Sequence, residues 1–279
     1  MTQQDIVFIG SSSTGLAKLS ESTHFHVTEV LCLQSRLTET LQNVANERNL
    51  RLTPFNWIKD FTQKILTHPT STIFFIYQLD MLVPGSLTKR NRFFNVHRGN
   101  LQTNRGPNPD VWPLLMGHET TALSLHQINH KIDAGKLIQA FEVPITDQDD
   151  TVSLKAKMEA GIPVLVEALH FHLTGDLDGE EIQDGKYYPW ITENDFTIDP
   201  AVDSIETASR KIRSQRTYNG AIVYLNGTKH YVLEMHLDPN IDDRKNSILV
   251  MIDGQLVQFV KNPDPVYPPP PIRPPATRI

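Results

Sequence analysis

Short, strongly apolar runs alternate with stretches of helical periodicity through the first hundred of the chain's 279 residues. The clearest runs are 6–9 (IVFI), 27–33 (VTEVLCL), 72–77 (TIFFIY) and 93–97 (FFNVH). Such runs are typical of strands buried on both faces, and helices between strands indicate parallel crossover connections. The sequence therefore predicts an α/β fold with a doubly wound, mostly parallel sheet.

Ligands of such sheets bind in a crevice beyond the carboxyl ends of the strands. Tyr77 and His97 each end one of the apolar runs, so both side chains are expected to face that crevice. The small-residue loop 10–15 (GSSSTG) follows the first run and suits a tight turn into a helix. It could also hold an anion on helix N–H groups, but it lacks both G-x-G-x-x-G spacing and a P-loop lysine.

Two further segments are expected to extend the sheet and one to cover it. Residues 121–128 and 137–145 are extended runs on either side of a turn at 129–135, which predicts a long hairpin. Residues 152–173 carry leucine, methionine and isoleucine at helical spacing. This pattern favours one helix packed on a face of the sheet.

The composition changes near Gly175, and the chain is expected to divide into four parts. These are a catalytic domain (1–180), a linker (181–200), a small β-rich module (201–262) and a proline-rich tail (263–279). Within the module a helix is expected over 202–213. Asn226-Gly227 and Asp253-Gly254 each separate two apolar runs, which predicts two hairpins with type I′ turns.

The composition also narrows the classes of function. A formal net charge of −6 argues against a nucleic-acid partner, whose phosphates call for a basic surface. Cys32 is the only cysteine, which rules out an intrachain disulfide and suits a buried apolar residue. Without a signal-peptide pattern or an apolar run of about 18 residues, we expect a cytoplasmic protein with no membrane contact. No cluster of metal-ligating residues has ligand spacing, so no metal is expected.

Three polar residues indicate acyl-transfer chemistry. Asn95 and His97 lie two apart on one strand, so their side chains share a face. A neutral imidazole exchanges protons near neutral pH, and an amide can donate to an oxyanion on an acyl carbon. Asp133, brought close by the hairpin, would orient the imidazole and stabilise its charged form. The residues alone leave open that His97 is structural and that Asp-Ala-Gly merely turns the chain.

Four blocks occur in a characteristic order: Asn95-Val96-His97, Arg105-Gly106-Pro107-Asn108-Pro109, Gly117-His118-Glu119-Thr120-Thr121 and Asp133-Ala134-Gly135-Lys136-Leu137-Ile138. In this order they resemble the formyltransferase family that uses 10-formyltetrahydrofolate, including glycinamide ribonucleotide, methionyl-tRNA and nucleotide-sugar N-formyltransferases. Further similarity to the tRNA and sugar enzymes follows in Tyr187-Tyr188-Pro189 and Asn219-Gly220-Ala221. The resemblance covers residues 5–235.

The resemblance implies a Rossmann-like formyltransferase fold and the following roles. The catalytic residues would be Asn95, His97 and Asp133. The formyl-folate co-substrate would contact Met81, Leu82, Val83, Ile128 and Asp133, and the amine acceptor would contact Tyr77, Arg105, Gly106 and Asn108. The segment Arg98–Gln102 departs from the family's Ser-Leu-Leu-Pro loop, which affects the identity of the acceptor.

For the acceptor we favour a small primary amine, an amino sugar on a nucleotide. Methionyl-tRNA and a carrier-bound amino acid are the alternatives within the enzyme class. A folate- or nucleotide-binding relative without activity is the alternative outside it, and folate binding without product would identify it. The module could bind substrate, form a homodimer or cap the fold.

Overall fold

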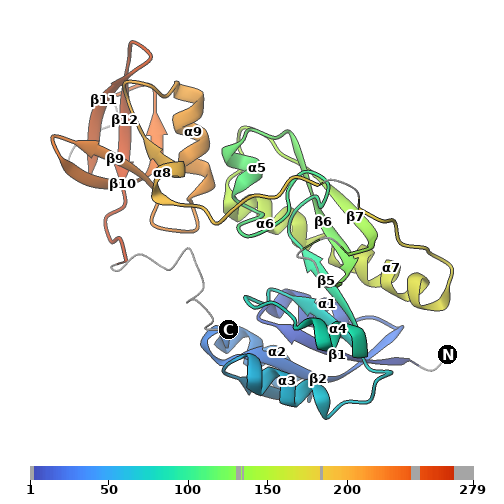
Figure 1. Cartoon of the computed structure of the whole chain (residues 1–279). Coiled ribbons are helices and arrows are strands. Elements are labelled where there is room, and N and C mark those ends of the chain that lie inside the picture. The colour runs from blue at the N-terminus through green and yellow to red at the C-terminus, as the bar shows by residue number, and fades with distance from the viewer. Residues whose placement is uncertain (1–2, 130–132, 134, 183–184, 240–245, 267–279) are drawn as a thin grey trace.

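The computed structural model describes residues 3–129, 133, 135–182, 185–239 and 246–266. A seven-stranded sheet forms the larger part of the molecule (Figure 1). Its strands are β1 (Gln4–Gly10), β2 (Phe25–Leu33), β3 (Arg51–Phe55), β4 (Ile73–Tyr77), β5 (Arg92–His97), β6 (Thr120–Gln127) and β7 (Leu137–Pro144). The order is β3-β2-β1-β4-β5-β6-β7, with β1 to β5 parallel and β6 and β7 antiparallel to their neighbours. The predicted mostly parallel, doubly wound sheet is confirmed.

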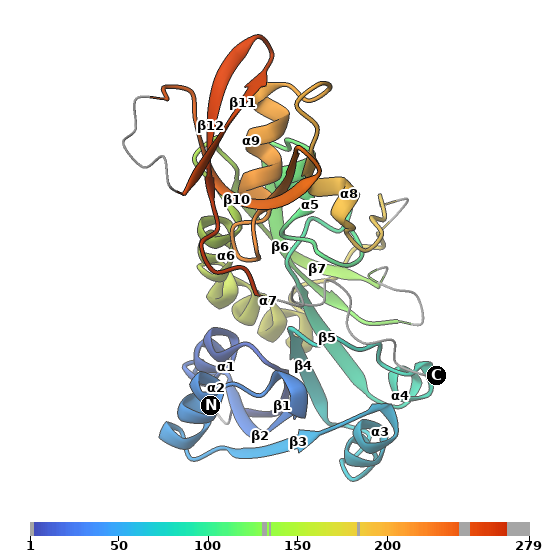
Figure 2. The same ribbon diagram turned by 90° about the vertical axis from the view of Figure 1, so that its left-hand side faces the viewer.

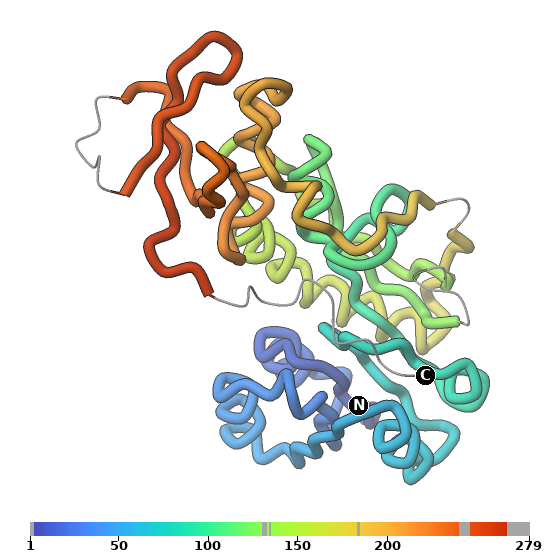
Figure 3. Tube along the Cα trace, turned by 60° about the vertical axis from the view of Figure 1, so that its left-hand side comes forward, coloured from blue at the N-terminus to red at the C-terminus, as the bar shows by residue number. Residues whose placement is uncertain are grey.

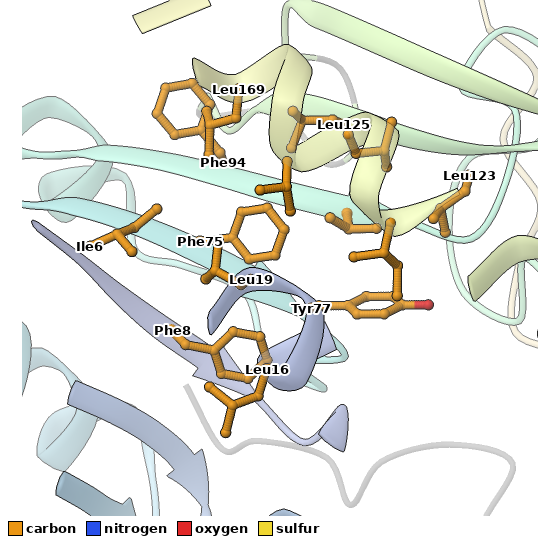
Figure 4. Packing of buried hydrophobic residues seen from close by; sticks show 14 of the residues in the cluster. Ile6, Phe8, Leu16, Leu19, Phe75, Tyr77, Phe94, Leu123, Leu125 and Leu169 are labelled. Carbon is orange, nitrogen blue, oxygen red and sulfur yellow. The ribbon is translucent and has the colours of Figure 1, made fainter. Parts of the chain in front are cut away.

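Helices cover both faces of this sheet. One face packs against α1 (Ser13–Ser20), α2 (Glu39–Glu47), α6 (Thr151–Glu159) and α7 (Ile162–Thr174). The other face packs against α3 (Ile58–Leu66) and α4 (Gly85–Arg90). A 3₁₀ turn, η1 (Gln34–Arg36), follows β2, and α5 (Trp112–Leu115) precedes β6. Figure 4 shows the first of these cores, where Phe8, Phe75 and Phe94 on the strands meet Leu16 of α1 and Leu169 of α7.

Two expected elements differ in the structure. The expected helix over 152–173 is two helices, because it breaks between Glu159 and Ile162. Pro163, in the first turn of α7, has no N–H to donate to the oxygen of Glu159, so the helix cannot continue unbroken. Gly161 lies at the break, where a Cβ atom would be 2.3 Å from the ring of Phe141. The strand β3, which contains Pro54, was not predicted. It lies at the sheet edge, the position at which a strand tolerates proline.

A second, five-stranded sheet forms the C-terminal module. Its strands are β8 (Thr197–Ile198), β9 (Ala221–Leu225), β10 (Thr228–His236), β11 (Ser247–Ile252) and β12 (Gln255–Lys261), in the order β11-β12-β10-β9-β8. Both predicted hairpins are present, and all four turn residues have the positive φ that a type I′ turn requires. The helix α9 (Ile205–Ser214) packs on this sheet, and α8 (Glu193–Phe196) leads into β8. The helix begins at Ile205 and not at Val202, because Ser204 caps it.

The module is docked on the catalytic part beside α5 and α6 (Figure 2). An apolar cluster at the junction includes a stacked pair, Trp112 and Tyr188, with ring centroids 4.8 Å apart. Arg213 of α9 donates to the main-chain oxygens of Thr146 and Asp149. Figure 3 shows the gold segment that connects the two parts passing beside the green segment after β5.

Some expectations fall on residues outside the described ranges. The proline-rich tail is described only for 263–266, and the turn of the β6–β7 hairpin lacks 130–132 and 134. The hairpin itself is confirmed by the antiparallel register of β6 and β7.

We expect Gly10→Ala to lower the free energy of unfolding by at least about 1–3 kcal/mol, the usual cost of a strained backbone position. Gly10 has a φ of +140°, and a Cβ there would lie 1.8 Å from the main-chain oxygen of Tyr77. Chemical denaturation would measure the change. Gly85→Ala is the matched control, because nothing lies within 4 Å of its Cβ position. Equal stability of the two variants would contradict this account.

Candidate active site

The end of β5 carries two of the three expected catalytic side chains. In the antiparallel register of β5 and β6, Asn95 pairs with His126 and His97 pairs with Ser124. Residues paired across two strands project to the same face of the sheet, so the two histidines and the amide lie together. His97 is 6% exposed and His126 is 2% exposed, so water reaches little of either ring.

Asp133 joins this group from the β6–β7 hairpin. It has a left-handed backbone conformation, with a φ of 46°, and its Oδ2 accepts a hydrogen bond of 3.0 Å from the main-chain N–H of Gly106. The same Oδ2 lies 3.8 Å from Nδ1 of His97, and Oδ1 lies 3.9 Å from Nε2 of His126. The structure therefore brings Asn95, His97 and Asp133 together, as the sequence predicted.

A main-chain oxygen sets the tautomer of His97. Nε2 of His97 lies 2.9 Å from the carbonyl oxygen of Asn104. A carbonyl oxygen only accepts, so Nε2 must carry the proton. In the neutral ring the lone pair is therefore on Nδ1, the nitrogen that faces Asp133. His97 is arranged to accept a proton at Nδ1, and the charged ring would then face a carboxylate.

The loop after β5 is shaped to make this contact. Gly99 packs against both partners: a Cβ there would lie 2.8 Å from Nε2 of His97 and 2.7 Å from the oxygen of Asn104. The side chain of Asn104 donates to the oxygen of Pro109 at 2.6 Å, and the hydroxyl of Ser124 donates to the oxygen of Gly99 at 2.8 Å. Gly99, in the segment that departs from the family loop, thus leaves room for the contact between His97 and the oxygen of Asn104.

His126 is a member of the site that the sequence reading missed. Its Nε2 lies 3.1 Å from Nδ2 of Asn95. Burial lowers its pKa to about 4, against a smaller opposing effect of Asp133, so the ring is neutral at pH 7. A neutral Nε2 can accept one amide proton and leave the second N–H of Asn95 for another acceptor. The sequence carried no signal for this role, because only the strand register identifies His126 as the partner of Asn95.

The residues expected to contact folate lie on one face of the sheet. Met81, Val83 and Ile128 are half-buried and pack against the core beneath α3 and α4, whereas Leu82 is 62% exposed. The main-chain N–H of Ile128 donates to the oxygen of Phe93, which fixes that segment at the edge of β5. These side chains form an apolar surface next to the catalytic group, of the kind on which a flat ring packs.

The residues expected to contact the acceptor are more enclosed than the sequence suggested. Tyr77 does not open into the crevice: it is 1% exposed and packs against α1, because Gly15 leaves room for its ring. Arg105 donates to the main-chain oxygens of Leu101 and Ile182. The N–H of Gly106 binds Asp133, so this residue contacts the catalytic group itself.

Asn108 holds the connecting segment to the module. Its side-chain oxygen accepts from the N–H of Ile191, and its main-chain oxygen accepts from the N–H of Val111. Its backbone is left-handed, with a φ of 55°, a conformation that asparagine tolerates better than most residues.

In the part of the chain that the structure describes, no helix is both long enough and apolar enough to span a bilayer.

The fold of the chain is similar to that of solved N-formyltransferases. The chain superposes on an N-formyltransferase from Helicobacter canadensis in complex with folinic acid and dTDP-3-aminofucose, with a TM-score of 0.69 and 14% identity, over 93% of this chain and 100% of that one. A 4-N formyltransferase from Francisella tularensis gives a TM-score of 0.68 and 18% identity, over 81% and 95%. HypX from Aquifex aeolicus in complex with tetrahydrofolic acid gives 0.68 and 16%, over 92% and 44%.

By sequence, the chain is similar to methionyl-tRNA formyltransferases. The enzyme of Ehrlichia chaffeensis is 25% identical over 259 residues, which cover 85% of this chain and 82% of that protein. The enzyme of Levilactobacillus brevis is 30% identical over 138 residues, but this alignment spans only 48% of this chain and 44% of its relative. No family model matches the sequence. The resemblance to the formyltransferase family is confirmed, and these comparisons support formyl transfer as the chemistry of the site.

We expect the burial of His126 to make the protein less stable in acid. Because its pKa is lower in the folded chain (about 4) than in the unfolded chain (6.5), the unfolded chain takes up the proton first as the pH falls. The stabilising effect is complete above about pH 6.5 and declines towards pH 4, by on the order of 3 kcal/mol. Denaturation at several pH values should show a smaller decline for His126→Gln than for the unmodified protein. Parallel pH profiles would contradict the assignment.

Proposed function

We propose that this protein is an N-formyltransferase that moves the formyl group of 10-formyltetrahydrofolate to a primary amine, and that the acceptor is a nucleotide-linked amino sugar. The observation that carries the proposal is the meeting of Asn95, His97 and Asp133 beyond the end of β5, with an unprotonated Nδ1 facing the carboxylate. The similarity to formyltransferases by sequence and by fold supports it.

The co-substrate would bind on the side of the sheet that carries Met81, Val83 and Ile128. The main chain of 81–84 would contact the pteridine ring, and the half-buried side chains would pack against it. The exposed Leu82 would cover the ring from outside. The formyl group on the folate nitrogen would then lie at the amide of Asn95.

The reaction begins when the neutral amine attacks the formyl carbon and a C–N bond forms. The carbonyl oxygen becomes an oxyanion, which accepts a hydrogen bond from the N–H of Asn95 that His126 leaves free. His126 acts as a positioning residue, because its lone pair holds the amide in that orientation. No covalent enzyme intermediate is required.

The proton follows a route through His97. Nδ1 takes the proton from the attacking nitrogen, and the imidazolium is stabilised by Asp133. As the carbonyl re-forms and the bond to the folate nitrogen breaks, the proton passes to that nitrogen. The products are the N-formyl amine and tetrahydrofolate, so one proton moves from amine to folate and the enzyme returns to its starting state.

The charges of the C-terminal module favour a small acceptor over a transfer RNA. Within the described residues of the module, basic side chains form ion pairs within 4 Å. These pairs are Arg210–Glu206, Lys211–Asp203, Arg213–Asp147, Arg216–Glu234 and Lys229–Glu193. Cations paired in this way are poorly placed to bind a run of phosphates. The second candidate is methionyl-tRNA, which the sequence relatives favour.

The proposal keeps the division of the chain that the sequence suggested. Residues 1–180 would form the catalytic domain, 181–200 the linker, 201–262 the module and 263–279 the tail. The separate apolar core of the module and its docking beside α5 support this division.

Mass spectrometry of reactions with 10-formyltetrahydrofolate tests the proposal. The acceptors would be dTDP-linked amino sugars, methionyl-tRNA and glycinamide ribonucleotide. We expect one formyl group on an amino sugar. Formylation of methionyl-tRNA alone would select the second candidate, and folate binding without any product would select an inactive relative.

We expect Asn95→Ala, His97→Ala and Asp133→Ala each to nearly abolish turnover. Loss of one oxyanion donor typically lowers kcat by about 10²–10³. Steady-state kinetics would measure the effect, and circular dichroism would confirm that the variants fold. Retained turnover in any two of the three would exclude the mechanism.

Gly99→Ala tests the tautomer of His97 without changing a reacting group. The new methyl group would press on Nε2 and on the oxygen of Asn104, so their hydrogen bond should break. We expect kcat to fall by about 10–100-fold, because small misplacements of a catalytic group are costly. The KM for folate should stay unchanged. In the ¹⁵N spectrum of the unmodified protein, neutral His97 should be protonated at Nε2; protonation at Nδ1 would contradict the assignment.

A further inference from the structure

The residue after the catalytic histidine is an arginine that the mechanism does not use. Arg98 follows β5 directly. Its guanidinium lies near Asp110, Tyr77 and Tyr218, each of which raises its pKa. Tyr77 and Val96 belong to the core beneath α1, α6 and α7. Arg98 therefore faces the side of the sheet opposite to the proposed folate surface.

Arg98 makes no close pairing with a carboxylate among the described residues. Its Nη2 lies 3.9 Å from Oδ2 of Asp110, which is too long for a hydrogen bond. Lys155 lies 3.1 Å from the same oxygen. Two cations thus share one carboxylate. Glu159 lies near enough to influence Arg98, but it forms no ion pair within 4 Å among the described residues.

Two donors at this place bind no described group, and the Tyr77 hydroxyl is the fully buried one. The guanidinium of Arg98 is 21% exposed and makes no hydrogen bond in the described part of the chain. The hydroxyl of Tyr77 is buried and also has no hydrogen-bond partner there. Enclosed donors are nearly always satisfied, by protein, water or ligand, because leaving one unpaired costs about 1–3 kcal/mol. Planar guanidinium donors match the oxygens of a phosphate or carboxylate.

We propose that Arg98 binds an anionic oxygen group of the amine acceptor. This inference rests on the proposed function. Such an acceptor would place its amine at His97 and its anionic group at Arg98, the next residue. It must therefore carry the amine and the anionic group in one small molecule. A nucleotide-linked amino sugar has this form, since its diphosphate is attached to the ring that bears the amine. A sugar carboxylate offers the same chemistry.

The module contributes the remaining wall of this site. Tyr218 lies beside Asp110 and Arg98, and Lys155 lies 5.6 Å from the centre of its ring. Burial raises the pKa of Tyr218 to about 12, against the smaller lowering effect of a hydrogen bond with the side chain of Asn108. Arg98, from the catalytic part, and Tyr218, from the module, would thus enclose the anion from two sides.

Kinetics with matched acceptors tests the inference. The acceptors are a dTDP-linked amino sugar, the same sugar without the nucleotide, and its carboxylate-bearing counterpart. We expect Arg98→Met to raise the KM for the dTDP-linked sugar about 10–100-fold, the range of a charge-assisted hydrogen bond. The KM values for folate and for the uncharged sugar should not change. A rise for the carboxylate acceptor in place of the dTDP-linked one would identify a carboxylate as the anion.

The variants are chosen so that folding and binding separate. Arg98→Met keeps the apolar stem and leaves Asp110 paired with Lys155. Arg98→Lys keeps the charge without the planar donors, so its KM should be intermediate. Arg92→Ala, at the exposed opposite end of β5, is the matched control and should behave as the unmodified protein.

Two results would overturn the inference. If Arg98→Met lowers the melting temperature and leaves every KM unchanged, Arg98 is a structural cation, and the proposed function stands. If the unmodified protein formylates none of the acceptors, calorimetry with dTDP decides. Equal affinity of the unmodified protein and Arg98→Met rejects the inference, whereas a loss of 10-fold or more supports it although the proposed function fails.

Discussion

The antiparallel pairing of β5 with β6 is the constraint on which the site depends. It places His126 opposite Asn95 and Ser124 opposite His97, and the hairpin that continues β6 returns Asp133 to the same place. A shift of the register by one residue would turn these side chains to the other face. Parallel strands alone could not achieve this, because their connections are too long to bring a neighbouring turn back to the strand end.

Much of the fold could be predicted because the local patterns agree with the global arrangement. Apolar runs, Thr38 as a helix cap and two turn dipeptides with positive φ each specify structure over a few residues. The three expected catalytic residues also lie together, since Asn95 and His97 share a strand and a hairpin connects that strand to Asp133. The failures have a different origin. The break lies at Pro163, where Gly161 packs against the distant Phe141, and Tyr77 is enclosed by a helix that no local pattern places over it.

The site adds a second lesson about buried polar groups. His126 was indistinguishable in sequence from a core histidine, because its role follows only from the register that puts it beside Asn95. Asn104 acts through its main-chain oxygen, so its side chain carried no signal for this contact. Arg98 was discussed only as part of a loop that departs from the family pattern, although four fifths of its side chain is covered. Roles that depend on the main chain or on packing between distant segments are invisible to residue type.

The contacts between α9 and the catalytic part affect how far the amino-acid sequence can diverge while the fold is kept. Arg213 binds the main-chain oxygens of Thr146 and Asp149, and these acceptors exist whatever side chains those positions carry. An attachment of this kind tolerates sequence drift on one side of the junction. Solved structures only 14–18% identical share the fold over 81–93% of this chain. The contact between the two parts can therefore be kept while the residues of neighbouring substrate-binding surfaces change.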